Sequence, residues 1–151
     1  MKARGLACAT AESCTGGGVG AAITSAPGSS DVYLGGVVSY ANSVKEGVLG
    51  VKRSTLDAHG AVSPECAAEM AEGARRITGA DVAVSTTGIA GPGGGTEAKP
   101  VGLVWFGLAT PGGTRTEKAI FAGGREDVRK AAVLHAIGMI TAAAVDAKEK
   151  K

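Results

Sequence analysis

At 151 residues the chain has the size of one ordinary domain, long enough to bury roughly two-thirds of the surface that its unfolded form exposes. Apolar residues make up 44% and aromatic residues only 3%, so we expect a single domain over residues 1–151 with a core of small aliphatic side chains. The 16 Lys and Arg residues against 14 Asp and Glu give a net charge of +2, which is too small to indicate a nucleic-acid-binding surface.

The sequence gives no sign of a membrane span, a disulfide framework or a metal site. No apolar run approaches the roughly 20 residues that a helix needs to cross a bilayer, and the N-terminus lacks the pattern of a signal peptide. Cys8, Cys14 and Cys66 have no CxxC spacing, and His59 and His135 lie far apart in the sequence. We therefore predict a cytoplasmic protein that binds no membrane, metal ion or cofactor.

The first half of the chain predicts two strands, each followed by a turn and a helix. Residues 6–10 alternate alanine with Leu, Cys and Thr, which predicts a strand that passes through a tight turn into a helix over 19–24. Residues 35–40 form a second apolar run typical of a strand. Asn42 is well placed to cap a short helix over about 43–50.

The next segments predict a helix, a buried strand and a glycine-rich loop. Ser63 is a capping residue followed by a proline and an acid, so we expect a helix to begin there and to end at Gly79. Its predicted buried face consists of Ala67, Met70, Ala71, Ala74 and Ile77. Residues 82–86 predict a buried strand that leads into 88–95, a segment too rich in glycine for either regular structure.

The last third of the chain predicts an antiparallel hairpin and a long helix. Strands over 101–109 and 114–122 flank a Pro-Gly-Gly turn, and residues 125–147 carry apolar side chains at helical spacing. Helices between the first three strands and a hairpin late in the chain are typical of a layered α/β domain with a mixed sheet. The charged run 148–151 is expected to be a solvated end.

Three unusual segments, residues 12–18, 40–45 and 88–95, follow the first three predicted strands. In open α/β sheets, ligand sites lie beyond the carboxyl ends of the parallel strands. If these three strands are parallel, all three segments face one cleft. We therefore look for chemistry in these segments.

The turn after the first strand is a candidate for a nucleophile. Ser13 lies where a strand passes into a helix, and free backbone N–H groups at a helix N-terminus can stabilise an anion. A serine hydroxyl there would have an oxyanion hole beside it. The expected amide donors are those of Cys14, Thr15, Gly16 and Gly17. From this turn alone, the alternative that Ser13 or Thr15 only caps the helix is the more frequent case.

The segment after the second strand offers a base for that serine. Neither histidine has an evident reason to lie near Ser13, whereas a neutral lysine can serve, as it does in Ser-Lys variants of the catalytic triad. Lys45 would lie at about the third residue of the helix capped by Asn42, where the helix dipole together with burial would lower its pKa. Tyr40 would supply a hydrogen bond between the two side chains. For an arbitrary lysine, exposure on the surface is the commoner outcome.

The glycine-rich segment offers backbone amides to a substrate. With Thr87 and Lys99 nearby, it would let amides approach a phosphate or a carbonyl, or it is merely a flexible loop. It matches neither the P-loop nor the dinucleotide fingerprint. Arg125, at the start of the last helix, either reaches an anionic ligand or stays in solvent. We expect His59 at a helix end and His135 inside the last helix, both in structural positions.

Four motifs in the same order carry a family resemblance. They are residues 10–17 (TAESCTGG), 35–42 (GGVVSYAN) with Lys45, 59–63 (HGAVS), and 87–96 (TGIAGPGGGT) with 99–102 (KPVG). On these motifs the chain resembles the C-terminal domain of the CinA competence/damage-inducible proteins, which is also found as the stand-alone nicotinamide-nucleotide amidase. The resemblance covers nearly the whole chain.

The resemblance implies a fold, an activity and a set of site residues. The fold is a three-layer α/β/α sandwich with a mixed, mostly parallel five-stranded sheet. The activity is hydrolysis of nicotinamide mononucleotide to nicotinate mononucleotide and ammonia, without a metal or cofactor. The family's serine, tyrosine and lysine carry over to Ser13, Tyr40 and Lys45. The expected substrate-binding residues are Asn42, Thr87, Gly88, Gly91, Gly93, Gly94, Gly95, Thr96 and Arg125.

Two other functions stay open, and the chain departs from the family pattern at two places. The alternatives are a non-catalytic nucleotide-binding or adaptor module linked to competence or DNA damage, and an amidase for a different pyridine or nucleoside amide. Family members usually carry a longer helix before the first strand, and residues 97–98 replace a proline-containing sequence. The missing helix, together with the small-residue helices, favours a homo-oligomer. The resemblance implies a small nucleotide as the ligand, and the low net charge does not indicate a nucleic acid.

Overall fold

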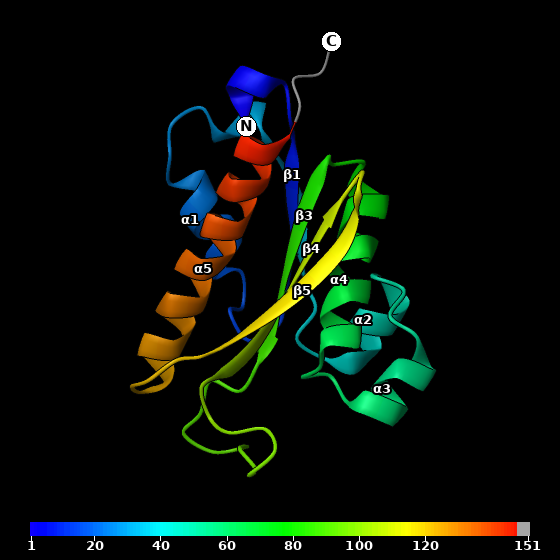
Figure 1. Ribbon diagram of the computed structural model, residues 1–151, viewed down its shortest axis with the longest axis vertical. Helices are drawn as coiled ribbons and strands as arrows, with labels where there is room; N and C mark the ends of the chain where they lie inside the picture. Colours follow the sequence, from blue (N-terminus) through cyan, green and yellow to red (C-terminus); the bar gives the residue numbers. More distant parts are fainter. Residues whose placement is uncertain (148–151) are drawn as a thin grey trace.

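One sheet of five strands in the order β2–β1–β3–β4–β5 runs through the computed structural model, which describes residues 1–147 (Figure 1). The predicted solvated run 148–151 lies outside the described residues. The strands are β1 (Cys8–Glu12), β2 (Tyr33–Val38), β3 (Val82–Gly88), β4 (Leu103–Thr110) and β5 (Gly113–Ile120). β1 is parallel to β2 and β3, whereas β4 runs antiparallel to β3 and β5. The predicted mixed five-stranded sheet is confirmed.

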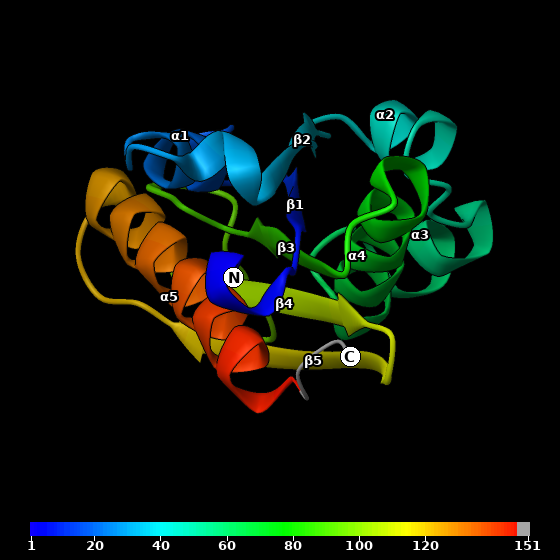
Figure 2. The ribbon, with the colours of Figure 1, turned by 90° about the horizontal axis from the view of Figure 1, so that it is seen from above.

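Helices cover both faces of this sheet. They are α1 (Gly18–Thr24), α2 (Asn42–Gly47), α3 (Arg53–His59), α4 (Pro64–Thr78) and α5 (Arg125–Asp146), with short 3₁₀ turns η1 (Lys2–Arg4) and η2 (Ser29–Asp31). α1 and α5 lie on one face of the sheet, and α2, α3 and α4 lie on the other (Figure 2). This arrangement is the three-layer α/β/α sandwich that the family resemblance implied.

Burial along each strand follows its place in the sheet. Every residue of β1 and nearly every residue of β3 is buried, because both strands have a neighbour on each edge and helices on each face. β2 and β5 form the two edges, and their residues largely alternate between more and less exposed positions. The prediction of a buried strand over residues 82–86 is therefore confirmed.

An apolar cluster on each face holds the layers together. The cluster under α1 and α5 contains Phe106 and Val84 of the sheet together with Val128 of α5. The cluster under α4 contains Met70 of that helix and Leu49 of the loop after α2. Alanines fill much of the remaining space in both clusters, as the composition predicted, and buried cysteines fill part of it as well.

Gly107 on β4 lets α4 lie directly against the sheet. A Cβ atom at this position would overlap the backbone carbonyl of Ala67 in α4 and lie 2.7 Å from Ser85 Oγ. We expect Gly107→Ala to lower the free energy of unfolding by about 1–3 kcal/mol, because the backbone of α4 has to move away. Urea unfolding measures the change. Gly138→Ala in α5 is the control, because its Cβ meets nothing within 4 Å, and equal destabilisation by both changes would contradict the argument.

Several predicted element boundaries need correction. β1 begins at Cys8 and continues to Glu12, because its pairing with β2 and β3 extends that far. Asn42 does not cap α2: the chain turns into the helix one residue earlier, with Ala41 at the N-cap and no side-chain cap. α3 was not predicted, since Thr55 is its only buried residue and it shows no apolar period. Ile77 is 47% exposed and lies outside both core clusters.

Helix α5 corrects the prediction that no apolar run approaches the length of a membrane span. By length and composition alone it is long and apolar enough to cross a membrane, and it is the one such helix within residues 1–147. In the structure, however, Val128, Ala132, Ala136 and Ile140 of α5 are buried in the cluster against the sheet. The core helix of a soluble protein can have the same length and the same apolar composition as a membrane-spanning helix.

Candidate active site

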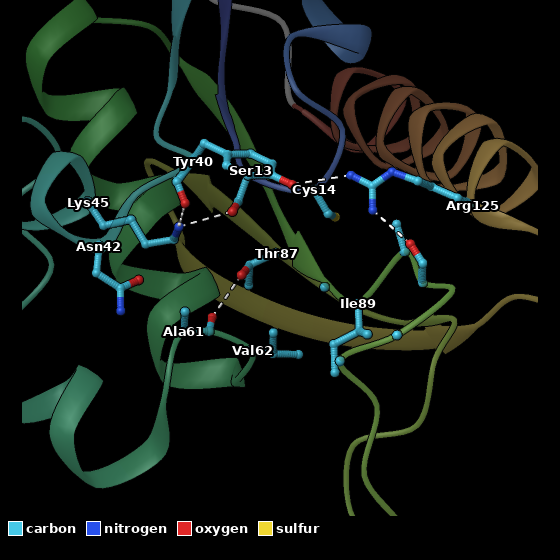
Figure 3. A pocket seen from close by; sticks show the side chains of 15 residues that line it. Ser13, Cys14, Tyr40, Asn42, Lys45, Ala61, Val62, Thr87, Ile89 and Arg125 are labelled. Atoms are coloured by element: carbon cyan, nitrogen blue, oxygen red, sulfur yellow. Dashed lines mark hydrogen bonds between the residues drawn. The ribbon is translucent and has the colours of Figure 1, made fainter.

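The segments that follow β1, β2 and β3 meet at one edge of the sheet. The order of the strands reverses at β1, since β2 lies on one side of it and β3 on the other. Such a switch point is where open α/β sheets place their ligand sites. A pocket of about 290 Å³ opens there, and all three segments contribute to its lining (Figure 3).

The pocket brings together most, but not all, of the predicted site residues. Those that line it are Ser13, Cys14, Tyr40, Asn42, Lys45, Thr87, Gly88, Gly91, Gly93, Gly94 and Arg125. Those outside the lining are Thr15, Gly16, Gly17, Gly95 and Thr96. Thr96 instead closes a turn, with its amide donating to the Lys99 carbonyl at 2.8 Å, and Gly95 packs against Val101.

Ser13 and Lys45 form the contact at the centre of the pocket. Lys45 Nζ lies 3.0 Å from Ser13 Oγ and donates to the backbone carbonyl of Tyr40 at 3.2 Å (Figure 3). It also donates to the backbone carbonyl of Ser39 at 2.6 Å. Ser13 follows β1 directly, and its own amide donates to the Thr86 carbonyl at the end of β3. The two central strands therefore fix the position of the hydroxyl that faces Lys45.

Burial lowers the pKa of Lys45, as its position among buried groups requires. The residue is only 1% exposed, and removing an ammonium from water favours the neutral amine and holds its pKa below the ordinary lysine value. α2 has only six residues and Lys45 is the fourth of them, so burial is the cause of the lowered pKa that the structure supports, and a contribution of the helix dipole stays a prediction.

Tyr40 does not bridge Ser13 and Lys45 as predicted. Its side chain is 62% exposed, and its hydroxyl accepts a hydrogen bond from Arg125 Nη2 at 3.2 Å. Only its backbone carbonyl contacts Lys45. Arg125 Nη1 also donates to the Gly91 carbonyl at 2.8 Å, so this arginine links the segment after β2 to the glycine-rich loop at the mouth of the pocket (Figure 3).

The carboxylate of Glu12 occupies the N-terminus of α1. It is 2% exposed, and its Oε2 accepts from Thr15 Oγ1 at 2.5 Å, Gly17 N at 3.1 Å and Val19 N at 2.9 Å. Its Oε1 accepts from Gly20 N at 2.8 Å. A buried carboxylate with four donors is satisfied, and it takes up the helix N-terminus that we expected an oxyanion to use.

The predicted oxyanion donors therefore narrow to two amides. The Gly16 amide donates to the Ser13 carbonyl at 3.0 Å, and the Gly17 amide donates to Glu12, so neither is free for a substrate. The amides of Cys14 and Thr15 remain. Ser13 is not a helix cap either, because Gly17 is the N-cap residue of α1 and the Glu12 carboxylate accepts the first amides of the helix.

The remaining predicted residues shape the rim and floor of the pocket. Thr87 is buried, and its hydroxyl donates to the Ala61 carbonyl at 2.8 Å, which ties the end of β3 to the loop before α4. Asn42 is exposed at the rim. Gly93 and Gly94 contribute exposed backbone from the glycine-rich loop.

Two charged residues near Ser13 were missed in the sequence. Glu12 could have been recognised, because an acid at the end of a buried strand needs donors close by. Arg129 of α5 donates from Nε to the Cys14 carbonyl and from Nη2 to the Thr15 carbonyl, both at 3.2 Å. Its spacing of four residues from Arg125 was a signal that both lie on one helix face.

The sequence also gave no sign of an apolar wall formed by Ala61, Val62 and Ile89. This wall comes partly from the loop between α3 and α4, whose place in space no local pattern determines. The histidines lie elsewhere: His59 ends α3 as predicted, and His135 of α5 contacts Glu117 on β5. Within residues 1–147, no group of three or more His, Cys, Asp or Glu side chains could hold a metal ion.

Comparison with known proteins agrees with the fold and identifies the family. The family model for the CinA C-terminal domain matches residues 1–144. The chain belongs to this family. A putative competence-damage inducible protein of Caldanaerobacter subterraneus subsp. tengcongensis is 55% identical over 140 residues, which are 93% of this chain and 34% of that protein. A CinA-like protein of Chloroherpeton thalassium is 59% identical over 110 residues, 73% of this chain and 26% of that protein.

Solved structures of family members share the whole architecture. The competence damage-inducible protein A of Klebsiella pneumoniae superposes with a TM-score of 0.92 at 39% identity, covering 97% of this chain and 91% of that one. A CinA superfamily protein of Escherichia coli gives a TM-score of 0.88 at 38% identity, covering 92% and 81%. The curated relatives are longer, and this chain spans about a third or less of their length.

Proposed function

We propose that this CinA-family domain is a serine amidohydrolase that deamidates nicotinamide mononucleotide, with Ser13 as the nucleophile and Lys45 as its base. The surroundings of Lys45 Nζ carry the proposal. A neutral amine has two N–H groups, and two backbone carbonyls, those of Ser39 and Tyr40, accept them. Its one lone pair is then left for the proton of Ser13 Oγ, 3.0 Å away.

The reaction would proceed through an ester on the serine. Lys45 takes the Ser13 proton as Oγ bonds to the carboxamide carbon, while the Cys14 amide stabilises the oxyanion. The C–N bond then breaks, and ammonia leaves with the proton that Lys45 returns. Water next gives a proton to Lys45 and attacks the nicotinoyl ester. Ser13 takes that proton back as nicotinate mononucleotide departs.

The lining of the pocket supports a nucleotide amide as the substrate. Val62 and Ile89 lie across the pocket from Ser13 and present an apolar surface suited to the face of a pyridinium ring (Figure 3). Arg125 is the first residue of α5 and lines the pocket, so its guanidinium favours a phosphate at the mouth. No cofactor is required by this chemistry.

Ammonia release tests the proposal. We expect release from nicotinamide mononucleotide, with kcat/KM lower by roughly tenfold or more for nicotinamide riboside, which lacks the phosphate for Arg125. EDTA should leave the rate unchanged, and loss of activity with EDTA would contradict metal-free catalysis. Absence of ammonia from every amide tested would contradict an amidase.

Other results of the same assay separate the alternatives. Faster turnover of a different pyridine or nucleoside amide would replace the substrate and keep the Ser-Lys chemistry. Binding of the mononucleotide without turnover would favour a nucleotide-binding or adaptor module. A homo-oligomer in the cytoplasm, without a nucleic-acid or membrane partner, stays a prediction.

A further inference from the structure

The turn that carries Ser13 is held by charged groups from two sides. On its N–H side, the Glu12 carboxylate accepts the Gly17 amide and two amides of α1. On its carbonyl side, the Arg129 guanidinium donates to the carbonyls of Cys14 and Thr15 at 3.2 Å each. A turn with both kinds of backbone group engaged has little freedom to change its dihedral angles.

Arg129 stands behind the pocket rather than in it. It does not line the pocket of Ser13 but lines a separate groove of about 480 Å³ between α5 and the turn. Its neighbour on the same helix face, Arg125, is the residue that reaches the pocket mouth. The two arginines of α5 therefore have different tasks, and only Arg125 is placed to meet a substrate.

One hydrogen bond of Arg129 reaches a remaining oxyanion donor, the Thr15 amide, through the backbone. The carbonyl of Cys14 and the amide of Thr15 belong to one planar peptide group, so a guanidinium on the carbonyl makes that N–H a stronger donor. Among residues 1–147 the Thr15 amide has no acceptor, and the Cys14 amide contacts the thiol of its own residue. Arg129 thus acts on the Thr15 amide through the Cys14 carbonyl, and it holds in place Cys14, whose own amide belongs to the peptide group of the Ser13 carbonyl.

We propose that Arg129 is a positioning residue of the reaction, which fixes and polarises the Cys14–Thr15 backbone beside Ser13 without touching the substrate. The inference rests on the proposed role of Ser13 as the nucleophile. It assigns to α5 a contribution to the oxyanion stabilisation that the pocket lining alone does not reveal.

Steady-state kinetics of Arg129→Ala give the first test. A displaced donor or nucleophile slows the chemical step by about 10²-fold, so we expect kcat to fall by that order while KM stays within about twofold. Arg129→Lys keeps the charge but cannot donate from two fixed nitrogens, so its kcat should lie between those of the wild type and Arg129→Ala. Lys130→Ala is the matched control, because Lys130 is exposed and forms an ion pair with Glu126 at 2.7 Å.

Two further measurements distinguish positioning from a loss of folding. Free guanidinium at concentrations below denaturation should restore part of the kcat of Arg129→Ala, since the groove gives it a route to the vacated site, and should not affect Lys130→Ala. Labelling of Ser13 by a fluorophosphonate, in which a P–O bond forms and fluoride leaves, depends on the same oxyanion donors but does not involve an amide substrate. Its rate should fall in Arg129→Ala and recover with guanidinium.

Each outcome is decisive. If the labelling rate and the kcat of Arg129→Ala both lie within about twofold of the wild-type values, the proposal is wrong. If its activity falls only in proportion to folded protein, measured by circular dichroism, and guanidinium restores nothing, Arg129 is merely structural. If Arg129→Ala does not fold, a folded Arg129→Lys with wild-type kcat overturns the proposal equally. If the wild type itself is not labelled at Ser13, the proposed nucleophile fails instead.

Discussion

Replacing Ser13 with alanine should lower kcat for the amide by roughly 10⁴-fold or more and leave substrate binding nearly unchanged. The change removes the one atom that bonds to the acyl carbon, and the hydroxyl's one contact within residues 1–147 is Lys45 Nζ at 3.0 Å. Initial rates of ammonia release and calorimetric titration with the mononucleotide measure the two effects. Ser25→Ala at the exposed end of α1 is the control and should behave as the wild type.

The same variant separates Ser13 from its neighbour Cys14 as the nucleophile. Burial raises the pKa of the Cys14 thiol to about 11, so it stays protonated near neutral pH and is a poor nucleophile. Acid quenching of the wild type during turnover should therefore trap a nicotinoyl group on Ser13, found by mass spectrometry. Wild-type rates in Ser13→Ala, or a nicotinoyl group on Cys14, would move the nucleophile to the thiol.

The parts of the fold that could be predicted are those with a strong local pattern. The alternation over residues 6–10 predicts a strand and residues 82–86 predict a buried one, and the cap and proline at the start of α4 predict its first turn, where Ser63 Oγ accepts the Cys66 amide. α3 could not be predicted, because it contributes a single buried residue, Thr55. The structure shows that it packs on α4 rather than on the sheet.

For the site, the sequence predicted which segments meet but not how their side chains are oriented. Motifs at the ends of parallel strands predicted that Ser13, Lys45 and the glycine-rich loop meet, because topology alone determines that placement. The direction of the Tyr40 side chain and the partners of the Gly17 amide depend on contacts between distant elements. Sequence spacing carries no information on such contacts.

Replacing Lys45 with methionine should lower kcat by about 10²–10⁴-fold, the usual contribution of a general base. Methionine has a similar length and no charge, so the cavity stays filled. Lys52→Met is the control, because Lys52 is exposed and its Nζ lies 4.0 Å from Glu69.

In the wild type, kcat/KM should rise with pH through an apparent pKa below the ordinary lysine value of 10.5, since only the neutral amine accepts the Ser13 proton. A rate that falls or stays constant over that range would contradict the role of Lys45.

The pH dependence of stability tests the lowered pKa of Lys45 independently of the kinetics. Because burial lowers the pKa of Lys45 in the folded state, the unfolded chain binds more protons between that pKa and 10.5. Below this window the folded wild type bears the full penalty of a buried ammonium, and the penalty is relieved as pH rises through it. The carbonyls of Ser39 and Tyr40 lose their donor in Lys45→Met at every pH, so the slope and not the absolute difference carries the prediction. The wild type should gain stability relative to Lys45→Met as pH rises. Urea unfolding of both proteins across the window measures this slope, and a flat or opposite slope would mean that Lys45 stays protonated in the fold and cannot act as the base.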